Sequence, residues 1–340
     1  MPTSDILYLS RADLSALGAG RSQPYLDAVG DALLIHYHGD YVQPLKPYLR
    51  WPGANHIADR IIAMPGYLGG KRPIAGLKWI GSRQHNPVRH GLPRASALIV
   101  LNDVETNQPR AIMEGGLISG MRTAAITAIG ARHLARAGFS RLAVIGCGPI
   151  GRMQVQTLLE QFPAIAQVRL FDVDPEAATK LRDHLGTRFA IDWQIAASAE
   201  DAVRGSEVVV TCTVTDTPYL PFEWLAPGAF LSNVSIMDVH KEVFVRADKV
   251  VVDDWAQSNR EGKVLHQLVE EGRFSHAQLH AELGQIVAGA RAGRERDEEI
   301  ILLNAIGMAL DDLACARHFF ELAVSVGVGQ QLPLYGHVDA

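Results

Sequence analysis

The sequence predicts an α/β protein of two domains, one built on a doubly wound parallel sheet and one α+β domain built on an open antiparallel sheet. The chain has 340 residues, and at about 150 residues per domain this length suits two domains. In the second part of the chain, short Val- and Ile-rich runs alternate with helix-like segments, as in parallel strands covered by helices. In the first third, glycine and proline separate short apolar runs, which favours an antiparallel sheet.

The composition excludes several classes of protein. Apolar residues make up 48% and charged residues 20%, as in ordinary globular proteins, and the net charge of −5 disfavours nucleic acid as a partner. No apolar run approaches the roughly 18 residues of a membrane helix, and the first residues lack the pattern of a signal peptide. Three widely spaced cysteines do not suit a disulfide framework or a zinc site. We therefore expect a cytoplasmic enzyme without membrane contact.

The first third of the chain predicts the elements of the antiparallel sheet. The runs at 61–64, 74–80 and 96–101 predict short strands, and we expect the sheet to be open and barrel-like. A proline-free, alanine-rich stretch from 118 to 137 follows, with cations near its end and Gly138 just beyond it. Cations in the last turn and a glycine after it are typical of a helix C-terminus. This stretch therefore predicts a long helix.

After Gly138 the chain alternates between strands and helices. We predict strands at 141–145, 168–171, 207–213, 229–236 and 249–252, and helices at 151–161 and 175–185. The segment 308–326 has apolar residues at helical spacing and follows the last strand, so we expect it to return to the first domain. The predicted domains are therefore residues 1–120 with 310–340, and residues 121–309.

The strongest motif is the turn Gly146-Cys147-Gly148-Pro149-Ile150-Gly151, which lies between a predicted strand and a predicted helix. In this context Gly146 permits a tight turn, Gly148 lets the backbone approach a pyrophosphate, and Gly151 packs the helix against the strand. The helix N-terminus then faces the phosphates with its partial positive charge. The turn therefore predicts a Rossmann-type domain that binds a dinucleotide.

The second predicted strand of this domain leads to Asp172, about 20 residues beyond the last glycine, where such domains carry a ribose-binding acid. A carboxylate there accepts hydrogen bonds from both ribose hydroxyls and repels a 2′-phosphate. The next residues, Val173 and Asp174, add no arginine that would offset this repulsion. We therefore expect NAD rather than NADP.

Two further groups follow strands at the same edge of the parallel sheet. Thr213 ends the strand 207–213, where its hydroxyl can reach the cofactor, although threonine is also common in strands for its β-propensity alone. Asp238 follows the strand 229–236, where a proton acceptor beside the nicotinamide is needed. An aspartate there can equally be the N-cap of a following helix, and the spacing leaves both alternatives open.

Cations amid small or apolar neighbours in the first domain are candidates for binding a substrate carboxylate. Alternation places Lys78 on the same strand face as Ile74, and Arg122 lies among small residues of the predicted long helix. Arg50 and Arg94 are further candidates, and a solvated surface charge is the alternative for each of these cations. The histidines lack zinc-site spacing, so no metal is predicted.

These residues together resemble the ornithine cyclodeaminase/mu-crystallin superfamily. The resemblance rests on Arg122-Thr123-Ala124-Ala125, on the Lys78 strand, on Asp238 with Lys241-Glu242, and on the stretch 300–307, and it covers nearly the whole chain. It implies a homodimer, a Rossmann NAD-binding domain and an N-terminal domain for substrate binding and dimerisation.

The resemblance also implies roles for individual residues. Asp238 and Lys78 match catalytic positions, Lys78 and Arg122 match a carboxylate-binding pair, and Arg50 matches a further carboxylate-binding arginine. Asp172 matches the ribose ligand. The other cofactor contacts that it implies are Gly146, Gly148, Pro149, Ile150, Gly151, Thr213, Ser235, Ile236, Met237 and Lys241.

Longer stretches resemble one branch of the superfamily, the NAD-dependent dehydrogenases that release 2,3-diaminopropionate from N-(2-amino-2-carboxyethyl)-L-glutamate for siderophores of the staphyloferrin B type. These stretches are 78–82, 94–96, 211–216, 235–242, 252–255 and 280–285. Unlike the cyclodeaminases, the chain has no acid just before Met64-Pro65, and it has Arg94 at a threonine position. A substrate with three carboxylates needs cations, so we expect Arg94 and His240 to bind it.

The branch resemblance implies hydride transfer to NAD, with Asp238 as proton acceptor and water activator, 2-oxoglutarate as the second product, and functional coupling to a PLP-dependent synthase. One alternative is a cyclodeaminase, which converts ornithine to proline without net redox change. The other is a mu-crystallin-like binding protein without turnover. The missing acid and Arg94 disfavour the first, and the presence of Asp238, Lys78 and Arg122 disfavours the second.

Overall fold

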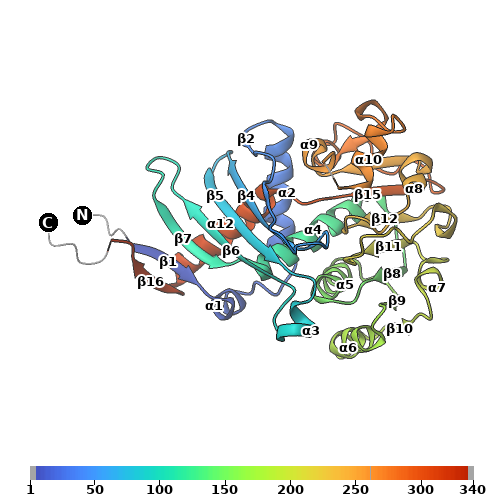
Figure 1. Ribbon diagram of the computed structural model, residues 1–340, viewed down its shortest axis with the longest axis horizontal. Helices are drawn as coiled ribbons and strands as arrows, with labels where there is room; N and C mark the ends of the chain where they lie inside the picture. The colour runs from blue at the N-terminus through green and yellow to red at the C-terminus, as the bar shows by residue number, and fades with distance from the viewer. Residues whose placement is uncertain (1–4, 261, 336–340) are drawn as a thin grey trace. The chain divides into compact units, whose positions relative to one another are not determined.

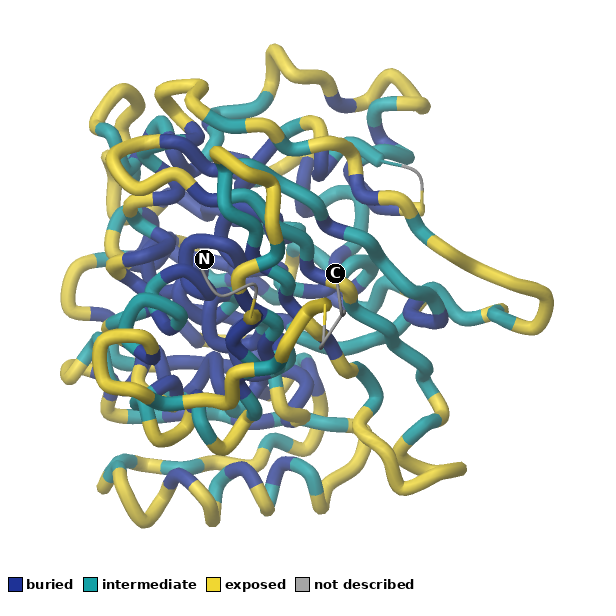
Figure 2. Tube along the Cα trace, turned by 90° about the vertical axis from the view of Figure 1, so that its left-hand side faces the viewer, coloured by how far each residue is buried: buried dark blue, intermediate teal, exposed yellow. Residues whose placement is uncertain are grey.

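The computed structural model describes residues 5–260 and 262–335, and the chain divides into two compact units. Unit 1 is Met1–Arg122 with Met308–Ala340, and unit 2 is Thr123–Gly307. The sequence places these divisions at 120/121 and 309/310. Figure 1 shows the chain coloured along its length, and Figure 2 shows that buried residues gather in the strands and helices and exposed ones in the connecting loops.

Unit 1 is built on a mixed sheet that holds eight strands in the described part of the chain, in the order β16-β1-β7-β6-β5-β4-β2, with β3 also paired to β4. The sheet is open, since no pairing among the described residues joins β16 to β2. One pairing differs from the expected antiparallel sheet: β1 runs parallel to β7, because helices rather than a hairpin turn separate them. The strands are β1 (Asp5–Leu9), β2 (Tyr41–Val42), β3 (Tyr48–Leu49), β4 (Arg60–Leu68), β5 (Ile74–Ser82), β6 (Ala95–Asn102), β7 (Pro109–Glu114) and β16 (Gln330–Pro333).

Helix α12 (Ala309–Val326) packs against one face of this sheet, over β4, β5 and β6. Two glycines permit the close approach. A Cβ at Gly76 would lie 2.8 Å from Leu313 Cδ2, and one at Gly66 would lie 3.3 Å from Leu313 Cδ1. The C-terminal helix therefore lies directly against the strand that carries Lys78. The other helices of unit 1 are α1 (Arg11–Ala16), α2 (Gln23–Tyr37), α3 (Asn86–His90) and the first part of α4 (Gly116–Leu134).

The opposite face of the sheet carries exposed apolar side chains. Trp79 of β5 and Leu98 of β6 are cross-strand partners and are 42% and 47% exposed, and Leu49 of β3 is 52% exposed. Neighbouring apolar residues on one sheet face form a patch of the kind that marks an interaction surface.

Unit 2 is built on a second sheet, in which every pairing among the described residues is parallel, in the order β10-β9-β8-β11-β12-β15-β13-β14. The central strands are buried along their whole length, which accounts for their continuous Val, Ile and Leu runs. The strands are β8 (Arg141–Ile145), β9 (Gln167–Phe171), β10 (Asp192–Ile195), β11 (Val208–Thr211), β12 (Phe230–Asn233), β13 (Lys249–Val252), β14 (Ala281–Glu282) and β15 (Ile301–Asn304).

The helices of unit 2 connect these strands in the manner of a doubly wound fold. They are the second part of α4, α5 (Pro149–Gln161), α6 (Pro175–Gly186), α7 (Ala199–Val203), α8 (Lys241–Arg246), α9 (Trp255–Ser258), α10 (Val264–Glu270) and α11 (Leu283–Val287). Within the described residues, each helix is too short or too polar to cross a membrane.

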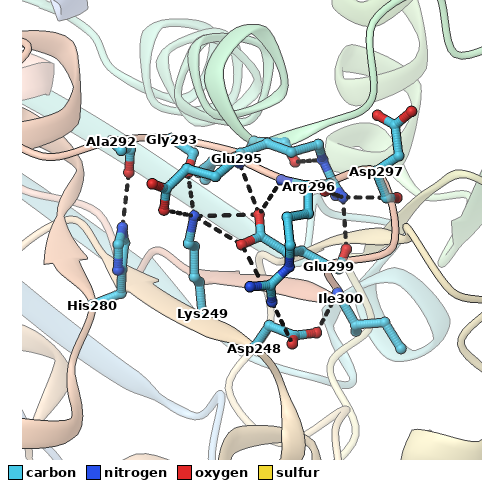
Figure 3. Close-up of polar contacts among 12 residues, drawn as sticks. Asp248, Lys249, His280, Ala292, Gly293, Glu295, Arg296, Asp297, Glu299 and Ile300 are labelled. Carbon is cyan, nitrogen blue, oxygen red and sulfur yellow. Dashed lines mark hydrogen bonds and ion pairs between the residues drawn. The ribbon is translucent and has the colours of Figure 1, made fainter.

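The buried side chain of Lys249, the first residue of β13, makes hydrogen bonds to the segment before β15 (Figure 3). The Nζ of Lys249 donates to the Gly293 carbonyl at 2.6 Å, to Glu295 Oε2 at 2.8 Å and to Glu299 Oε2 at 3.2 Å. Beside it, the Asp248 carboxylate accepts from the backbone N–H of Ile300 at 2.8 Å. This network lies at the edge of the sheet where the strands begin, so it supports the fold rather than the ligand-binding edge.

Candidate active site

The glycine-rich turn has the geometry that a dinucleotide requires. Gly146 follows β8 with a φ of 96°, and a Cβ there would lie 2.9 Å from the Cys212 carbonyl carbon. A Cβ at Gly151 would lie 2.0 Å from the Gly146 carbonyl oxygen, so α5 can approach the strand only with glycine there. A Cβ at Gly148, in contrast, would have no described atom within 4 Å. The first and third glycines therefore serve the fold, and the second leaves room for a ligand.

The N-terminus of α5 opens onto this room. The N-cap residue of the helix is Gly148, so no side chain at this position bonds to the first N–H groups, and Pro149 occupies the first turn. The uncapped N–H groups of a helix N-terminus suit phosphate oxygens, which also benefit from the helix dipole. Pro149, Ile150 and Gly151 therefore lie where the sequence predicts the pyrophosphate.

Asp172 lies beside the same turn, directly after β9. Its Oδ2 accepts from the backbone N–H of Cys147 at 2.7 Å, and its Oδ1 accepts from the backbone N–H of Asp174 at 3.0 Å. These bonds fix the carboxylate while each oxygen keeps a lone pair for a ribose hydroxyl. The turn, the helix N-terminus and Asp172 together fit a dinucleotide, and the carboxylate disfavours a 2′-phosphate.

Asp238 has a fully buried carboxylate at the strand-end edge of the same sheet. Its Oδ1 accepts from the Thr213 hydroxyl at 2.6 Å, and its Oδ2 accepts from the Thr213 backbone N–H at 3.2 Å and the Tyr219 hydroxyl at 3.1 Å. Burial raises the pKa of Asp238, although the hydrogen bonds from Thr213, Ser235 and Tyr219 oppose this shift. A base with a raised pKa is suited to proton transfer near neutral pH.

The structure bears on one of the two alternatives for Asp238 that the sequence leaves open, the N-cap. The N-cap of α8 is His240, whose side chain makes no cap hydrogen bond. Asp238 is therefore not the N-cap. Thr213 has a polar role too, since both its hydroxyl and its N–H are committed to Asp238.

A chain of amide and hydroxyl groups joins the ends of the neighbouring strands. The Oδ1 of Asn233 accepts from the Thr211 hydroxyl at 2.7 Å and from the Ser235 hydroxyl at 3.1 Å, and its Nδ2 donates to Asn304 Oδ1 at 2.7 Å. Ser235 is buried, and Ile236 and Met237 lie in the bend between it and Asp238. Sequence reasoning missed Asn233 and Asn304, and the signal for them was an amide at the end of an otherwise apolar strand.

Two predicted residues after Asp238 have protein partners of their own. Lys241, predicted as a cofactor contact, has an ion pair with Glu271, which follows α10. His240, predicted as a substrate ligand, donates its backbone N–H to the Leu220 carbonyl, and its side chain makes no cap hydrogen bond to α8.

In unit 1, three elements bring together the predicted carboxylate-binding pair. Lys78 of β5 donates from Nζ to Asp312 Oδ2 at 2.6 Å and to the Ser119 hydroxyl at 3.0 Å. Arg122 of α4 donates from Nε to Asp312 Oδ1 at 3.0 Å. Lys78, Arg122 and Asp312 are all buried, with Lys78 only 1% exposed. Neither cation is the solvated surface charge that the sequence left as the alternative.

Lys78 lies in a cluster of buried charges that includes Arg122, Asp312 and Lys46. Burial, helped by the charges of Arg122 and Lys46, lowers the pKa of Lys78 to about 7, although Asp312 opposes this. Burial alone would raise the pKa of Asp312, but Arg122 and Lys78 hold it below its ordinary value. An anion that joins the cluster would relieve the repulsion among its cations.

Sequence reasoning missed Lys46 and Asp312. Lys46 lies in an irregular segment rich in proline, where its burial has no periodic signal. Asp312 had a signal in the sequence, because it lies on the apolar face of the predicted helix 308–326, where a buried acid needs a partner.

The other two candidate arginines differ from each other. Arg94 is partly buried, burial lowers its pKa, and its guanidinium has no hydrogen bond or ion pair within residues 5–260 and 262–335. Arg50 donates to the carbonyl oxygens of His56 at 3.1 Å, Ile57 at 2.9 Å and Asp59 at 3.4 Å. The guanidinium of Arg50 therefore organises the loop before β4, whereas that of Arg94 has no such task among the described residues.

Comparisons with known proteins agree with this geometry. The model of the ornithine cyclodeaminase/mu-crystallin family matches residues 21–327. N-((2S)-2-amino-2-carboxyethyl)-L-glutamate dehydrogenase of Staphylococcus aureus is 54% identical over 333 residues, which cover 97% of this chain and 99% of the relative. The chain therefore resembles that enzyme along its whole length.

Two solved structures share the fold. The first is Δ1-pyrroline-2-carboxylate reductase of Thermococcus litoralis in complex with NADH and L-proline. It is 29% identical, with a TM-score of 0.90, and the match covers 96% of this chain and 100% of the reductase chain. A dimer of an archaeal alanine dehydrogenase with bound NAD is 31% identical, with a TM-score of 0.87, and the match covers 97% of this chain and 99% of that one. These matches confirm the predicted fold class. The chain belongs to the ornithine cyclodeaminase/mu-crystallin family.

Proposed function

We propose that this chain is an NAD-dependent dehydrogenase that converts N-(2-amino-2-carboxyethyl)-L-glutamate into 2-oxoglutarate and L-2,3-diaminopropionate, for siderophore biosynthesis. The Staphylococcus aureus relative, 54% identical, is named for this substrate. The observation that carries the proposal is the set of buried or partly buried cations in unit 1, Lys78, Arg122 and Arg94, of which Arg94 lacks a protein anion within the described residues. A substrate with three carboxylates supplies the anions that such a set needs.

The cofactor and the base come from unit 2. NAD would supply the hydride acceptor for the glutamate-derived Cα, so that the substrate becomes a protonated imine. Asp238 takes a proton from the water molecule that adds to the imine carbon, and it returns this proton to the bridging nitrogen, which then leaves as the amine. Thr213 holds Asp238 in place with two hydrogen bonds, at 2.6 and 3.2 Å. Collapse of the water adduct gives the ketone of 2-oxoglutarate and the free amine of 2,3-diaminopropionate.

The substrate is oriented by unit 1. Lys78 and Arg122 bind one carboxylate, and their fixed positions, each set by a hydrogen bond to Asp312, limit the movement of the reacting carbon. Arg94 binds a second carboxylate, and its planar guanidinium suits both oxygens. Lys78, with a pKa of about 7, can also carry a proton during turnover. His240 and Arg50 remain candidates for the third carboxylate, although Arg50 would have to leave its loop carbonyls.

The two alternatives make different demands on the site. A cyclodeaminase binds ornithine, whose distal amine needs an acid, but residues 60–63, directly before Met64-Pro65, include no acid and Arg94 adds a cation. A binding protein without turnover has no use for a buried base, yet Asp238 has a raised pKa. Both alternatives are therefore disfavoured.

We also propose a homodimer that forms through the exposed sheet face around Trp79, Leu98 and Leu49. The archaeal alanine dehydrogenase of the same fold is described as a dimer, and the apolar patch supplies a surface for one. The variant Leu98→Glu should then sediment as a monomer. Sedimentation of a mixture of the chain and a PLP-dependent synthase tests the proposed coupling, since a complex of the two would sediment faster than either protein alone.

The decisive test of the function is product formation by the purified chain. With NAD and N-(2-amino-2-carboxyethyl)-L-glutamate, NADH absorbance should rise in step with equal amounts of 2-oxoglutarate and 2,3-diaminopropionate. Ornithine and alanine should give no comparable rate. Conversion of ornithine to proline without NADH accumulation would establish the cyclodeaminase instead.

A further inference from the structure

We infer that Tyr219 is a positioning residue for Asp238, which holds the carboxylate in one orientation and keeps it ionised through a hydrogen bond from its phenol. The inference rests on the proposed function, because it concerns the base of that reaction. Tyr219 does not belong to the residues that the sequence marked as functional, and only the geometry brings it to this site.

Backbone hydrogen bonds fix the register between the two segments that meet here. The N–H groups of Tyr219 and Leu220 both donate to the Asp238 carbonyl at 3.0 Å, and the N–H of His240 donates to the Leu220 carbonyl at 3.0 Å. Leu220 and Val239 form a parallel bridge between the segments. The backbone of Tyr219 and the phenol of Tyr219 therefore bind the same residue, one at its carbonyl and the other at its carboxylate Oδ2 at 3.1 Å.

This double attachment restricts the carboxylate of Asp238. Thr213 donates to both carboxylate oxygens, and Tyr219 donates to Oδ2 from a different segment of the chain. Because donors from two segments converge on Asp238, its side chain can rotate only if these bonds break. A general base needs such a fixed orientation toward the proton that it takes.

The phenol acts as a donor across the working pH range. Burial, together with the charge of Asp238, raises the pKa of Tyr219 well above its ordinary value. The neighbouring titratable groups are Cys212, whose pKa burial raises, and Asp172, whose charge acts on Tyr219. On the chain after Asp238, Lys241 pairs with Glu271. Tyr219 therefore remains protonated while Asp238 titrates.

Loss of the phenol should change the titration of Asp238 in a defined direction. Burial raises the pKa of Asp238 and the hydrogen bond from Tyr219 lowers it, so without the bond the pKa rises further. In Tyr219→Phe the acid limb of the pH profile of kcat/KM should move to higher pH by about one unit. At a pH above the shifted limb the base is ionised again, so kcat/KM should rise toward the wild-type value, and the loss that remains measures the contribution of the phenol to the orientation of Asp238.

The matched control is Tyr25→Phe. Tyr25 is a buried tyrosine of unit 1 whose hydroxyl donates to the Ala19 carbonyl at 3.0 Å, so this variant loses a phenol hydrogen bond of similar length that does not involve Asp238. It should leave the acid limb unmoved. An acid limb in Tyr219→Phe that stays where the wild type has it would overturn the inference.

Asp238→Asn separates this inference from the proposed function. If Asp238→Asn abolishes turnover, the base is identified and Tyr219→Phe alone decides the role of Tyr219. If Asp238→Asn keeps wild-type activity with the same acid limb, the base assignment in the proposed function fails, and the positioning role fails with it.

Discussion

Replacement of Asp312, the carboxylate that Lys78 and Arg122 share, should cost much of the stability of unit 1. In Asp312→Asn, Lys78 and Arg122 lose their common partner while both remain buried, with their side chains 2% and 8% exposed. The removal of one partner from a buried ion pair typically costs about 3–5 kcal/mol, because the remaining charge is left uncompensated. At about 2–4 °C per kcal/mol, the Tm should fall by roughly 6–20 °C.

Thermal unfolding followed by circular dichroism measures this loss. The control is Glu321→Gln on the same helix, which removes an ion pair with Arg72 whose side chains are 40% and 58% exposed, and it should leave the Tm nearly unchanged. The double variant Asp312→Asn/Lys78→Met should be more stable than Asp312→Asn alone, because one of the uncompensated cations is then absent. Equal Tm values for Asp312→Asn and the control would refute the idea that the cluster is desolvated.

Three further predictions concern ligands. Asp172→Ser should narrow the preference for NAD over NADP measured by cofactor titration, and equal affinity of the wild type for both would contradict the role of Asp172. Arg94→Ala should raise the KM for the substrate by about one to two orders of magnitude, because a charge-assisted hydrogen bond of roughly 1.5–3 kcal/mol is lost, and the affinity for NAD should not change. An unchanged KM would remove Arg94 from the site. Burial lowers the pKa of Lys78 to about 7, and a substrate carboxylate bound beside Lys78 should raise this pKa again. Above pH 7, substrate binding should therefore take up protons, and the affinity for the substrate should fall as the pH rises. Calorimetry in buffers of different ionisation enthalpy measures this uptake, and a binding enthalpy independent of the buffer would contradict it.

The nucleotide site was predictable because its signals are local. The glycine-rich turn and Asp172 lie about 20 residues apart in one strand-helix-strand unit, and the short spacing fixes their relation. Lys78 was also predictable, since strand alternation places it on the face that α12 covers. For Asp238 the sequence left the N-cap alternative open, and only the structure excludes it, because His240 is the N-cap of α8.

The partners of these residues were not predictable, since long-range contacts supply them. Lys78 and Asp312 lie 234 residues apart in the chain, and no periodicity connects them. Tyr219 reaches Asp238 through a short parallel bridge outside the main sheet. Arg50 and Arg94 look alike in the sequence, and only their neighbours among the described residues distinguish a loop-organising arginine from one that can bind an anion.

The position of α12 in the chain has a consequence for folding during synthesis. Unit 2 is one continuous segment, Thr123–Gly307, whereas the sheet of unit 1 needs β16 beside β1 and α12 against β5. We expect the nucleotide-binding unit to fold on the ribosome while the first 122 residues still lack their core helix. Until Asp312 is translated, Lys78 and Arg122 lack the carboxylate that joins them, so we expect this pair to come into place only after the nucleotide-binding unit.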